Sequence, residues 1–288
     1  FAVARTLTVT STGGGGSSSV TSDTGGISVS GAATGSASYA SGTAVTLTAT
    51  AASGYRIVSW SGGGCSGTGA TCAVTLSSDT TVTVTFVQTF DLTVSKSGAG
   101  SGTVTSGDSF INCGATCSKT YDLASPATSV VLTATAASGS VFTGWSGACS
   151  NASGTCTVSM SAARSVTATF AVARVLTVTQ VGSGTVASAP SGISLASATT
   201  ATSSYADGSV VTLTATAAAG YRIQSWSGGG CSGSAATCDV TMSSAQTVTV
   251  TFVQTLLLTV STSGGGSSTV TSGDSFISCG ATCSKVYD

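Results

Sequence analysis

The most constraining feature of this 288-residue chain is that it repeats itself. Residues 86–122 return almost letter for letter as residues 252–288, and the opening FAVARTLTVT returns as FAVARVLTVT from Phe170. Self-similarity at a fixed period is the signature of a tandem array, in which one folded unit recurs along the chain. The sequence must therefore fold into units small enough to fit within one period.

Four phenylalanines at near-equal intervals mark the period, which is about 83 residues and within the range of small domains: Phe1, Phe86, Phe170 and Phe252. Two types of unit alternate. Type A contains GYRIVSWSGGGC or GYRIQSWSGGGC, and type B contains SVFTGWSGAC and an additional INCGATC segment. We expect residues 1–4 to end a preceding repeat, followed by A1 (5–86), B1 (87–170), A2 (171–252) and the first part of B2 (253–288). We also expect the sequence to be a window of a longer chain.

The composition excludes several classes of protein. Charged residues are 6% of the chain, there is no His, and all nine acidic residues are Asp. Most of the usual catalytic groups are thus missing, and we expect neither an enzyme nor a cofactor. The formal net charge is −1 and the eight Lys and Arg residues are scattered singly, which disfavours nucleic acid and membrane headgroups as partners. No apolar run is long enough to cross a bilayer, so we expect no membrane insertion in this segment.

Apolar and polar residues alternate along several segments. Val82, Val84 and Phe86 fall on one face of an extended segment, and the intervening threonines fall on the other. The same pattern recurs in VTLTATA from Val45. β-Branched residues with a two-residue period are typical of half-buried strands, which disfavours the alternative of a disordered Gly/Ser/Thr-rich stalk.

Short strands separated by Gly and Ser clusters predict an all-β fold, a tandem array of small Ig-like β-sandwiches. In B1 the expected strands are residues 92–97, 102–106, a segment around 110–121, 129–136, 141–145, 156–160 and 165–170. Ile57 and Trp60 fall on opposite faces of a regular strand, as do Phe142 and Trp145. A β-bulge near Ser59 or Gly144 would turn both aromatic residues inward.

The ten cysteines form five local pairs: Cys65 and Cys72, Cys113 and Cys117, Cys149 and Cys156, Cys231 and Cys238, Cys279 and Cys283. An even count with local, repeated spacing favours disulfides and hence an extracellular location. A zinc site is the alternative, but the spacings are C-x3-C and C-x6-C and no His is present. Each bridge would stabilise its unit by about 2–3 kcal/mol on the loop-entropy model.

Other residues have a functional and a structural interpretation. Trp60, Trp145 and Trp226 would suit sugar stacking, but one Trp at the same position of each unit favours a core anchor. Asp108 and Asp274 in TSGDSF fit a turn better than a calcium site, because each carboxylate lacks companions. The outward Thr rows are more typical of an ordinary sheet face than of an ice-binding array. Asn151 lies in a glycosylation sequon, NAS.

Nucleophilic chemistry would need Lys96, Lys119 or Lys285 as the base, since no His or Glu is present. Lys96 becomes Thr262 in the second copy, so that position is not required by each unit. Lys119 and Lys285 recur beside the paired cysteines. An intramolecular Lys–Asn or Lys–Asp crosslink there is the remaining chemical hypothesis.

The strings GYRIVSWSGGGCSG, TCAVTLSSDTTVTVTF and FTGWSGACSNASGTCTVSMSAARSVTATF resemble the divergent InlB B-repeat family of bacterial surface proteins. The resemblance covers nearly all of the chain. It implies an extracellular β-rich module used as a spacer or an adhesive element, and it supplies no catalytic residues. The A units depart from the family in their longer Gly/Ser-rich fronts, residues 11–35 and 183–204.

The connections between units contain neither Gly nor Pro, so we expect neighbouring repeats of the chain to be each other's partners at a restricted angle. Arg5 and Arg174 at one junction type, and Gln88 and Gln254 at the other, are candidates to fix that angle. We expect the shaft of an extracellular filament or a giant surface adhesin. Low charge also permits identical chains to associate. The alternative is a repetitive array that binds a glycan or a surface through the Gly/Ser-rich fronts or the Trp loops.

Overall fold

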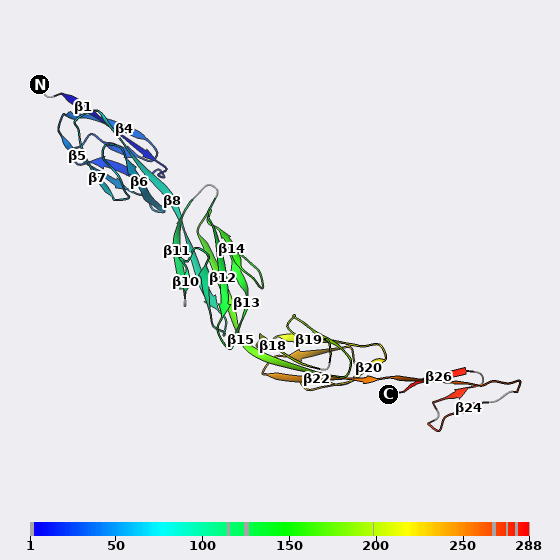
Figure 1. Ribbon diagram of the computed structural model, residues 1–288. Helices are drawn as coiled ribbons and strands as arrows, with labels where there is room; N and C mark the ends of the chain where they lie inside the picture. Colours follow the sequence, from blue (N-terminus) through cyan, green and yellow to red (C-terminus); the bar gives the residue numbers. More distant parts are fainter. Residues whose placement is uncertain are drawn as a thin grey trace. The chain divides into compact units, whose positions relative to one another are not determined.

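The computed structural model describes residues 3–113, 116–123, 127–197, 199–266, 269–274, 276–279 and 282–287. Across these residues the chain is all-β, as the sequence predicted (Figure 1). No helix long and apolar enough to span a bilayer occurs in the described ranges. The chain divides into two compact units: residues 1–97, 103–135 and 144–169 form unit 1, and residues 98–102, 136–143 and 170–288 form unit 2. Each is described by itself.

Repeat A1, in unit 1, is a sandwich of two four-stranded sheets. One sheet has the order β4-β1-β8-β6 and the other has the order β3-β2-β5-β7. The strands are β1 (Ala4–Thr12), β2 (Ser19–Ser22), β3 (Ser28–Ser30), β4 (Thr34–Ala40), β5 (Ala44–Thr50), β6 (Tyr55–Ser61), β7 (Thr71–Thr75) and β8 (Thr80–Ser97).

The alternating sequence pattern builds the core of A1. Leu7, Val82 and Phe86 from one sheet meet Val45 and Leu47 from the other, and all five side chains are at most 2% exposed. The intervening threonines point outward, as the two-residue period of a strand requires. The core of A1 is therefore built from aliphatic and aromatic side chains contributed by both sheets.

The first and last strands of A1 run parallel and side by side. Residues 7–12 of β1 pair in register with residues 80–85 of β8. β8 does not end with A1, because its 18 residues continue as the first strand of B1. The sequence predicted a connection without Gly or Pro at this point, and the structure has one continuous strand there. The strand is continuous from Thr80 to Ser97, a segment rich in β-branched and aromatic residues and free of Gly and Pro.

Repeat B1 uses the same topology. The second half of β8 pairs antiparallel with β11 and parallel with residues 164–169 of β15, and the facing sheet has the order β10-β9-β12-β14. Its further strands are β9 (Gly102–Ser106), β10 (Asn112–Cys113), β11 (Thr116–Asp122), β12 (Ser129–Ala136), β13 (Ser140–Gly147), β14 (Cys156–Ser159) and β15 (Arg164–Val181).

Repeat A2, in unit 2, has the same strand topology as A1. Residues 176–181 of β15 pair parallel with residues 246–251 of β22, and a second sheet has the order β17-β16-β19-β21. The strands are β16 (Gly184–Ala189), β17 (Ser194–Leu195), β18 (Thr200–Ala206), β19 (Val210–Ala217), β20 (Tyr221–Ser227), β21 (Thr237–Thr241) and β22 (Gln246–Gln254). In B2, two strand pairs are present: β23 (Leu256–Ser261) with β26 (Thr282–Tyr287), and β24 (Val270–Thr271) with β25 (Ser278–Cys279).

The predicted bulge occurs in both A repeats. Pairing between β6 and β8 shifts register between Ile57 and Ser59, and pairing between β20 and β22 shifts between Ile223 and Ser225. The extra residue turns Trp60 into the core while Ile57 packs against the same cluster. The equivalent irregularity near Gly144 stays a prediction.

Candidate functional site

The three tryptophans anchor one loop in each complete repeat. Their side chains are buried, with 3–4% exposed. Each indole nitrogen donates to a carbonyl nine residues later: Trp60 to Gly69 (2.7 Å), Trp145 to Gly154 (3.0 Å) and Trp226 to Ala235 (2.7 Å). The backbone nitrogen of each Trp donates to the same loop. These rings offer no open face to a sugar, in agreement with the core interpretation.

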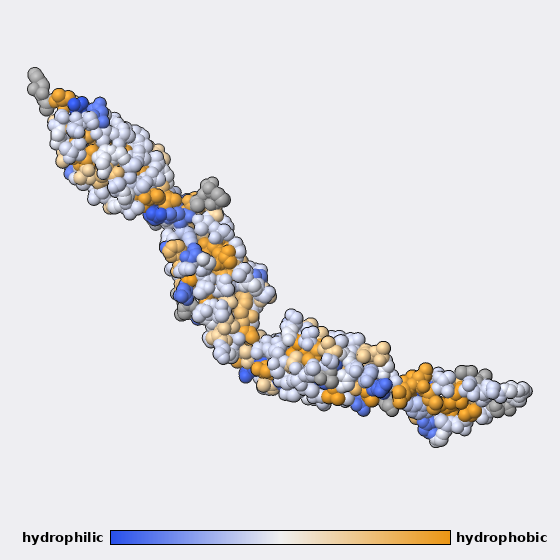
Figure 2. Space-filling model, viewed as in Figure 1, coloured by the Kyte–Doolittle hydropathy of each residue, from blue (hydrophilic) through white to orange (hydrophobic). Residues whose placement is uncertain are grey.

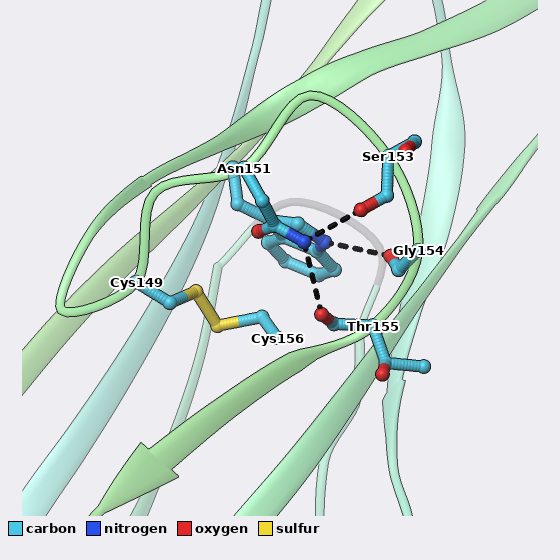
Figure 3. The surroundings of a disulfide bond; sticks show 7 residues. Cys149, Asn151, Ser153, Gly154, Thr155 and Cys156 are labelled. Carbon is cyan, nitrogen blue, oxygen red and sulfur yellow. Dashed lines mark hydrogen bonds between the residues drawn. A yellow bond between two sulfur atoms is a disulfide. The ribbon is translucent and has the colours of Figure 1, made fainter.

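A disulfide closes each tryptophan loop. Figure 3 shows the bridge between Cys149 and Cys156 beside the loop that it constrains. Equivalent bridges join Cys65 to Cys72 and Cys231 to Cys238. A bridge between Cys279 and Cys283 closes a shorter loop. Cys117 is also disulfide-bonded, whereas the side chain of its predicted partner Cys113 lies outside the described residues. The structure thus contains the local disulfides expected of the fold.

Asn151, the sequon asparagine, forms hydrogen bonds within its own loop. Asn151 Nδ2 donates to the carbonyls of Ser153 (2.5 Å) and Thr155 (3.1 Å), as Figure 3 shows, and the Asn151 carbonyl accepts from Trp145 N (2.8 Å). A glycan on Nδ2 would have to displace hydrogen bonds that hold the loop. The structural role of Asn151 is therefore the better-supported one.

A tyrosine holds the turn after the second strand of every complete repeat, a feature that sequence reasoning missed. In B1, Tyr121 Oη donates to Asp108 Oδ2 (2.8 Å), and Ser106 Oγ donates to the same carboxylate while accepting from Ile111 N (2.9 Å). In the A repeats Tyr39 contacts Ser22 and Tyr205 contacts Ser188. The recurring signal was a Ser five residues before an Ile and a Tyr near the end of a later strand.

These tyrosine-capped turns organise the Gly/Ser-rich fronts that the sequence left as possible contact regions. Ile27 and Val29 of A1, and Ile193 and Leu195 of A2, are buried in the core of their repeat. Asp108 is used within its turn, and no group of three or more metal-ligating side chains occurs among the residues that the structure describes. The hydrogen bonds that Asp108 and Asp274 accept from Ser106 and Ser272, and from the backbone of Phe110 and Phe276, favour the turn interpretation.

Burial and hydrogen bonding oppose each other at Asp108. Burial raises the pKa of the Asp108 carboxyl. The hydrogen bonds from Ser106, Tyr121 and the backbone of Phe110 lower this pKa by more, so that it lies below its ordinary value of 3.8. Burial and the neighbouring carboxylate raise the pKa of the Tyr121 hydroxyl. The pair is therefore held as carboxylate and neutral phenol.

The A1–B1 junction carries a salt bridge that the sequence did not reveal. Arg56, on β6 of A1, donates through Nε (2.6 Å) and a terminal nitrogen to the two carboxylate oxygens of Asp122, at the end of β11 of B1. Hydrogen bonding to Arg56 holds the pKa of Asp122 below its ordinary value, and it raises the pKa of Arg56. The two side chains remain 48% and 40% exposed, so the ion pair is only partly desolvated.

Backbone hydrogen bonds close the same junction from both sides of β8. Thr89 N donates to Gly54 O of A1 and Gln88 O accepts from Leu123 N of B1, each at 2.7 Å. Successive residues of a strand direct their backbone groups to opposite edges. A1 and B1 therefore overlap along β8, one on each edge, at the point where one repeat becomes the next.

The four residues proposed to fix the junction angle behave differently. Arg174 Nε donates to Asp207 Oδ1 (2.6 Å) within A2, so it does not join two repeats. The Arg5 side chain lies opposite Tyr39 inside A1. Gln88 and Gln254 pair with Tyr55 and Tyr221 at the end of their own A repeat. Gln88 reaches B1 through its backbone carbonyl, which accepts from Leu123 N.

An open cavity of about 450 Å³ lies beside this junction, lined by Arg56, Phe110, Lys119, Thr120, Tyr121, Asp122 and Thr128. Phe110 is 63% exposed, and Lys119 Nζ lies 4.1 Å from the centre of its ring. In B2, Lys285 lies over Phe276 in the same way, at 4.4 Å. The two recurring lysines thus contact an aromatic face, a cation–π arrangement that does not favour a crosslink to Asn or Asp.

The visible surface carries little charge. In Figure 2 most residues are pale, strongly hydrophilic ones are few, and small apolar areas are scattered among them. This distribution follows from a chain in which 6% of residues are charged.

Comparisons with known proteins extend these observations. The profile of the divergent InlB B-repeat domain matches residues 19–89, 92–174 and 175–255. A search of curated proteins gives no match.

Among solved structures, the chain is similar to the pilus adhesin SpaC from Lactobacillus rhamnosus GG, with 11% identity, a TM-score of 0.38, and coverage of 88% of this chain and 43% of that one. The Bacillus anthracis TIE protein is 10% identical with a TM-score of 0.25, and 99% of this chain and 62% of that one are covered. For the shaft pilin spaA from Lactobacillus rhamnosus GG the identity is 11%, the TM-score 0.18, and the coverage 86% and 98%. The chain spans less than two thirds of the length of the first two.

The family matches reach from A1 to the end of A2 and together cover most of the chain. They include the Trp loops, the bulged strands and the closing strands on which the sequence resemblance rested. The chain therefore belongs to the divergent InlB B-repeat family.

Proposed function

We propose that this chain is the structural repeat region of an extracellular filament or a giant surface adhesin, in which the repeats form a stiff shaft stabilised by disulfides. The observation that carries the proposal is β8, which is at once the last strand of A1 and the first strand of B1. A strand paired on its edges lacks the free rotations of a Gly/Ser linker. Length and tension would thus pass from A1 to B1 without slack.

The parallel pairing of first and last strands gives each repeat a load path. Tension enters A1 through β1 and leaves through β8, so residues 7–12 and 80–85 are pulled past one another and their paired residues are loaded together. Side chains reinforce these pairs: Thr12 bonds Thr85 (3.1 Å), and in B1 Ser95 bonds Thr167 (2.9 Å). The same parallel pairing recurs in B1 and A2.

The remaining parts of the proposal follow from this role. Neighbouring repeats of the same chain are the main partners, identical chains in a bundle are additional ones, and the location is outside the cell, where disulfides persist. No catalytic role is proposed, because neither the family nor the described side chains supply a nucleophile with its base. We retain A1 (5–86), B1 (87–170), A2 (171–252) and the start of B2 (253–288) as the division of the chain.

Small-angle scattering of the oxidised full chain tests the shaft. We expect the cross-section and length of an extended body whose dimensions do not change with ionic strength. A scattering profile of a flexible coil, or of folded beads with freely variable spacing, would contradict the proposal. Electron microscopy of the native material would then separate single threads from multi-chain filaments.

A second function, glycan or surface binding, is favoured by the cavity beside the A1–B1 junction. Exposed Phe110 with Arg56, Asp122 and Tyr121 around it combines an aromatic face with polar groups, as sugar sites do. A glycan array with the full chain and with Phe110→Ala tests this function. Saturable binding lost in the variant would support it, whereas equal binding by both chains would exclude this cavity.

A further inference from the structure

The backbone makes the same connection at both described junctions between complete repeats. Between A1 and B1, Thr89 N donates to Gly54 O and Leu123 N to Gln88 O, at 2.7 Å each. Between B1 and A2, Ala173 N donates to Gly139 O (2.9 Å) and Asp207 N to Val172 O (2.8 Å). Backbone geometry therefore does not distinguish an A-to-B junction from a B-to-A junction.

Two side-chain positions do distinguish them. The first is the exit position, two residues after the junction glycine: it is Arg56 in A1 and Val141 in B1. The second is the entry position, directly after the capping tyrosine: it is Asp122 in B1 and Ala206 in A2. Strand register confirms the equivalence, because Asp122 pairs with Thr89 and Ala206 pairs with Ala173.

We propose that these two positions specify which type of repeat follows which. The exit position of an A repeat carries a guanidinium and the entry position of a B repeat carries a carboxylate. At the A1–B1 junction these two groups form a bidentate ion pair. The exit of a B repeat presents Val141 and the entry of an A repeat presents Ala206, both half-buried. A charged pair at the A1–B1 junction thus corresponds to two small apolar residues at the same positions of the B1–A2 junction.

Two repeats of the same type in succession would bring together side chains that do not match at these two positions. Two A repeats in succession would place an Arg56-type guanidinium against a residue like Ala40, which is the A1 entry residue. Two B repeats would place Val141 against an Asp122-type carboxylate that has lost its partner. Discrimination of this kind comes as much from the unpaired charge in the wrong combination as from the ion pair in the right one.

The sequence repeats the arrangement at the next A-to-B boundary. Arg222 occupies the exit position of A2, and the entry position of B2 is Asp288, which lies outside the described residues. The proposal does not depend on whether the array bears load, since it concerns only the matching of neighbouring repeats.

The test is hydrogen exchange of the junction amides, Thr89 N–H and Leu123 N–H, measured by NMR in the full chain. Arg56→Val alone and Asp122→Ala alone each create a mismatch, and we expect exchange about two- to fivefold faster, the range of a partly exposed ion pair. The double variant Arg56→Val with Asp122→Ala converts the junction to the B-to-A chemistry, and exchange should return toward the wild-type rate.

Arg164→Val is the matched control, because Arg164 bonds Ser159 and Ser161 within B1 and its removal should leave both junction amides unchanged. If Arg56→Val unfolds A1, Arg56→Gln and Asp122→Asn provide the same mismatches with polar side chains. Single variants that exchange at the wild-type rate, or a double variant as fast as the singles, would overturn the proposal. The shaft function would survive that result, since scattering tests it separately.

Discussion

At the scale of single residues, glycine and tyrosine decide how the loops meet the strands. Gly147, in the W-S-G segment of B1, has φ +94°, and a Cβ there would lie 2.3 Å from Ser165 O of β15. Gly139 has a similar φ of +74° but nothing within 4 Å of a Cβ. The two positions separate backbone strain from steric overlap within one repeat.

Gly147→Ala should therefore destabilise B1 by more than Gly139→Ala. We expect Gly139→Ala to cost about 1 kcal/mol, the strain of a left-handed non-Gly residue, and Gly147→Ala to cost about 2–4 kcal/mol because the strand must also move. The indole N–H signal of Trp145 reports the unfolding of B1 alone, as each complete repeat has one Trp. Equal losses for both variants would show that the close approach to β15 is unimportant.

The Ser106–Asp108–Tyr121 group makes B1 sensitive to acid. Since the folded-state pKa of Asp108 is lowered, its contribution is fully present above the ordinary value of 3.8 and is lost as pH falls through the lower folded value. The stability difference between the wild type and Asp108→Asn should shrink over that range. Denaturant titrations between pH 2 and 6, followed at Trp145, measure it, and a difference that does not vary with pH would contradict the assignment.

At the scale of elements, the alternating pattern was sufficient to locate many strands. The expected strands 102–106 and 129–136 coincide with β9 and β12. The bulge was predictable because Ile57 and Trp60 had to share one core. The merging of two strands into β8 was not predictable. Two-residue alternation looks the same for one continuous strand and for two strands joined by a short extended connection. The Arg56–Asp122 pair also escaped prediction, since its residues lie 66 positions apart and only the register of β8 brings them together.

Removal of the Cys149–Cys156 bridge should weaken B1 by about 2–3 kcal/mol, because the bridge restricts the unfolded chain. Cys149→Ser with Cys156→Ser should lower the unfolding midpoint reported by Trp145 and leave that reported by Trp226 unchanged. The matched pair Cys231→Ser with Cys238→Ser in A2 should do the reverse. If either double variant lowered the midpoints at Trp145 and at Trp226 equally, each disulfide would not stabilise its own repeat alone.

At the scale of the whole molecule, one sandwich topology and one set of junction backbone hydrogen bonds recur along the array. Family membership follows from the sequence alone, and the structure adds how A1, B1 and A2 connect without a linker: the closing strands of A1 and B1 continue as the first strand of the next repeat. The disulfides of the Trp loops lie outside the parallel pairs formed by the first and last strands. Stability and load path are thus assigned to different parts of each repeat.

Stretching the full chain by its two ends in a single-molecule instrument tests whether the parallel strand pairs of each repeat resist the tension. We expect discrete unfolding events at a similar force in oxidised and reduced samples, because the parallel strand pairs resist the tension and the bridges do not. Reduction should lengthen the event of each A repeat by about 20 Å, since the bridged residues, separated by 7 positions, extend at about 3.4 Å each. The event of B1 should lengthen by more, because B1 has a second bridge at Cys117. Gradual lengthening without discrete events, or a collapse of the unfolding force on reduction, would contradict the account.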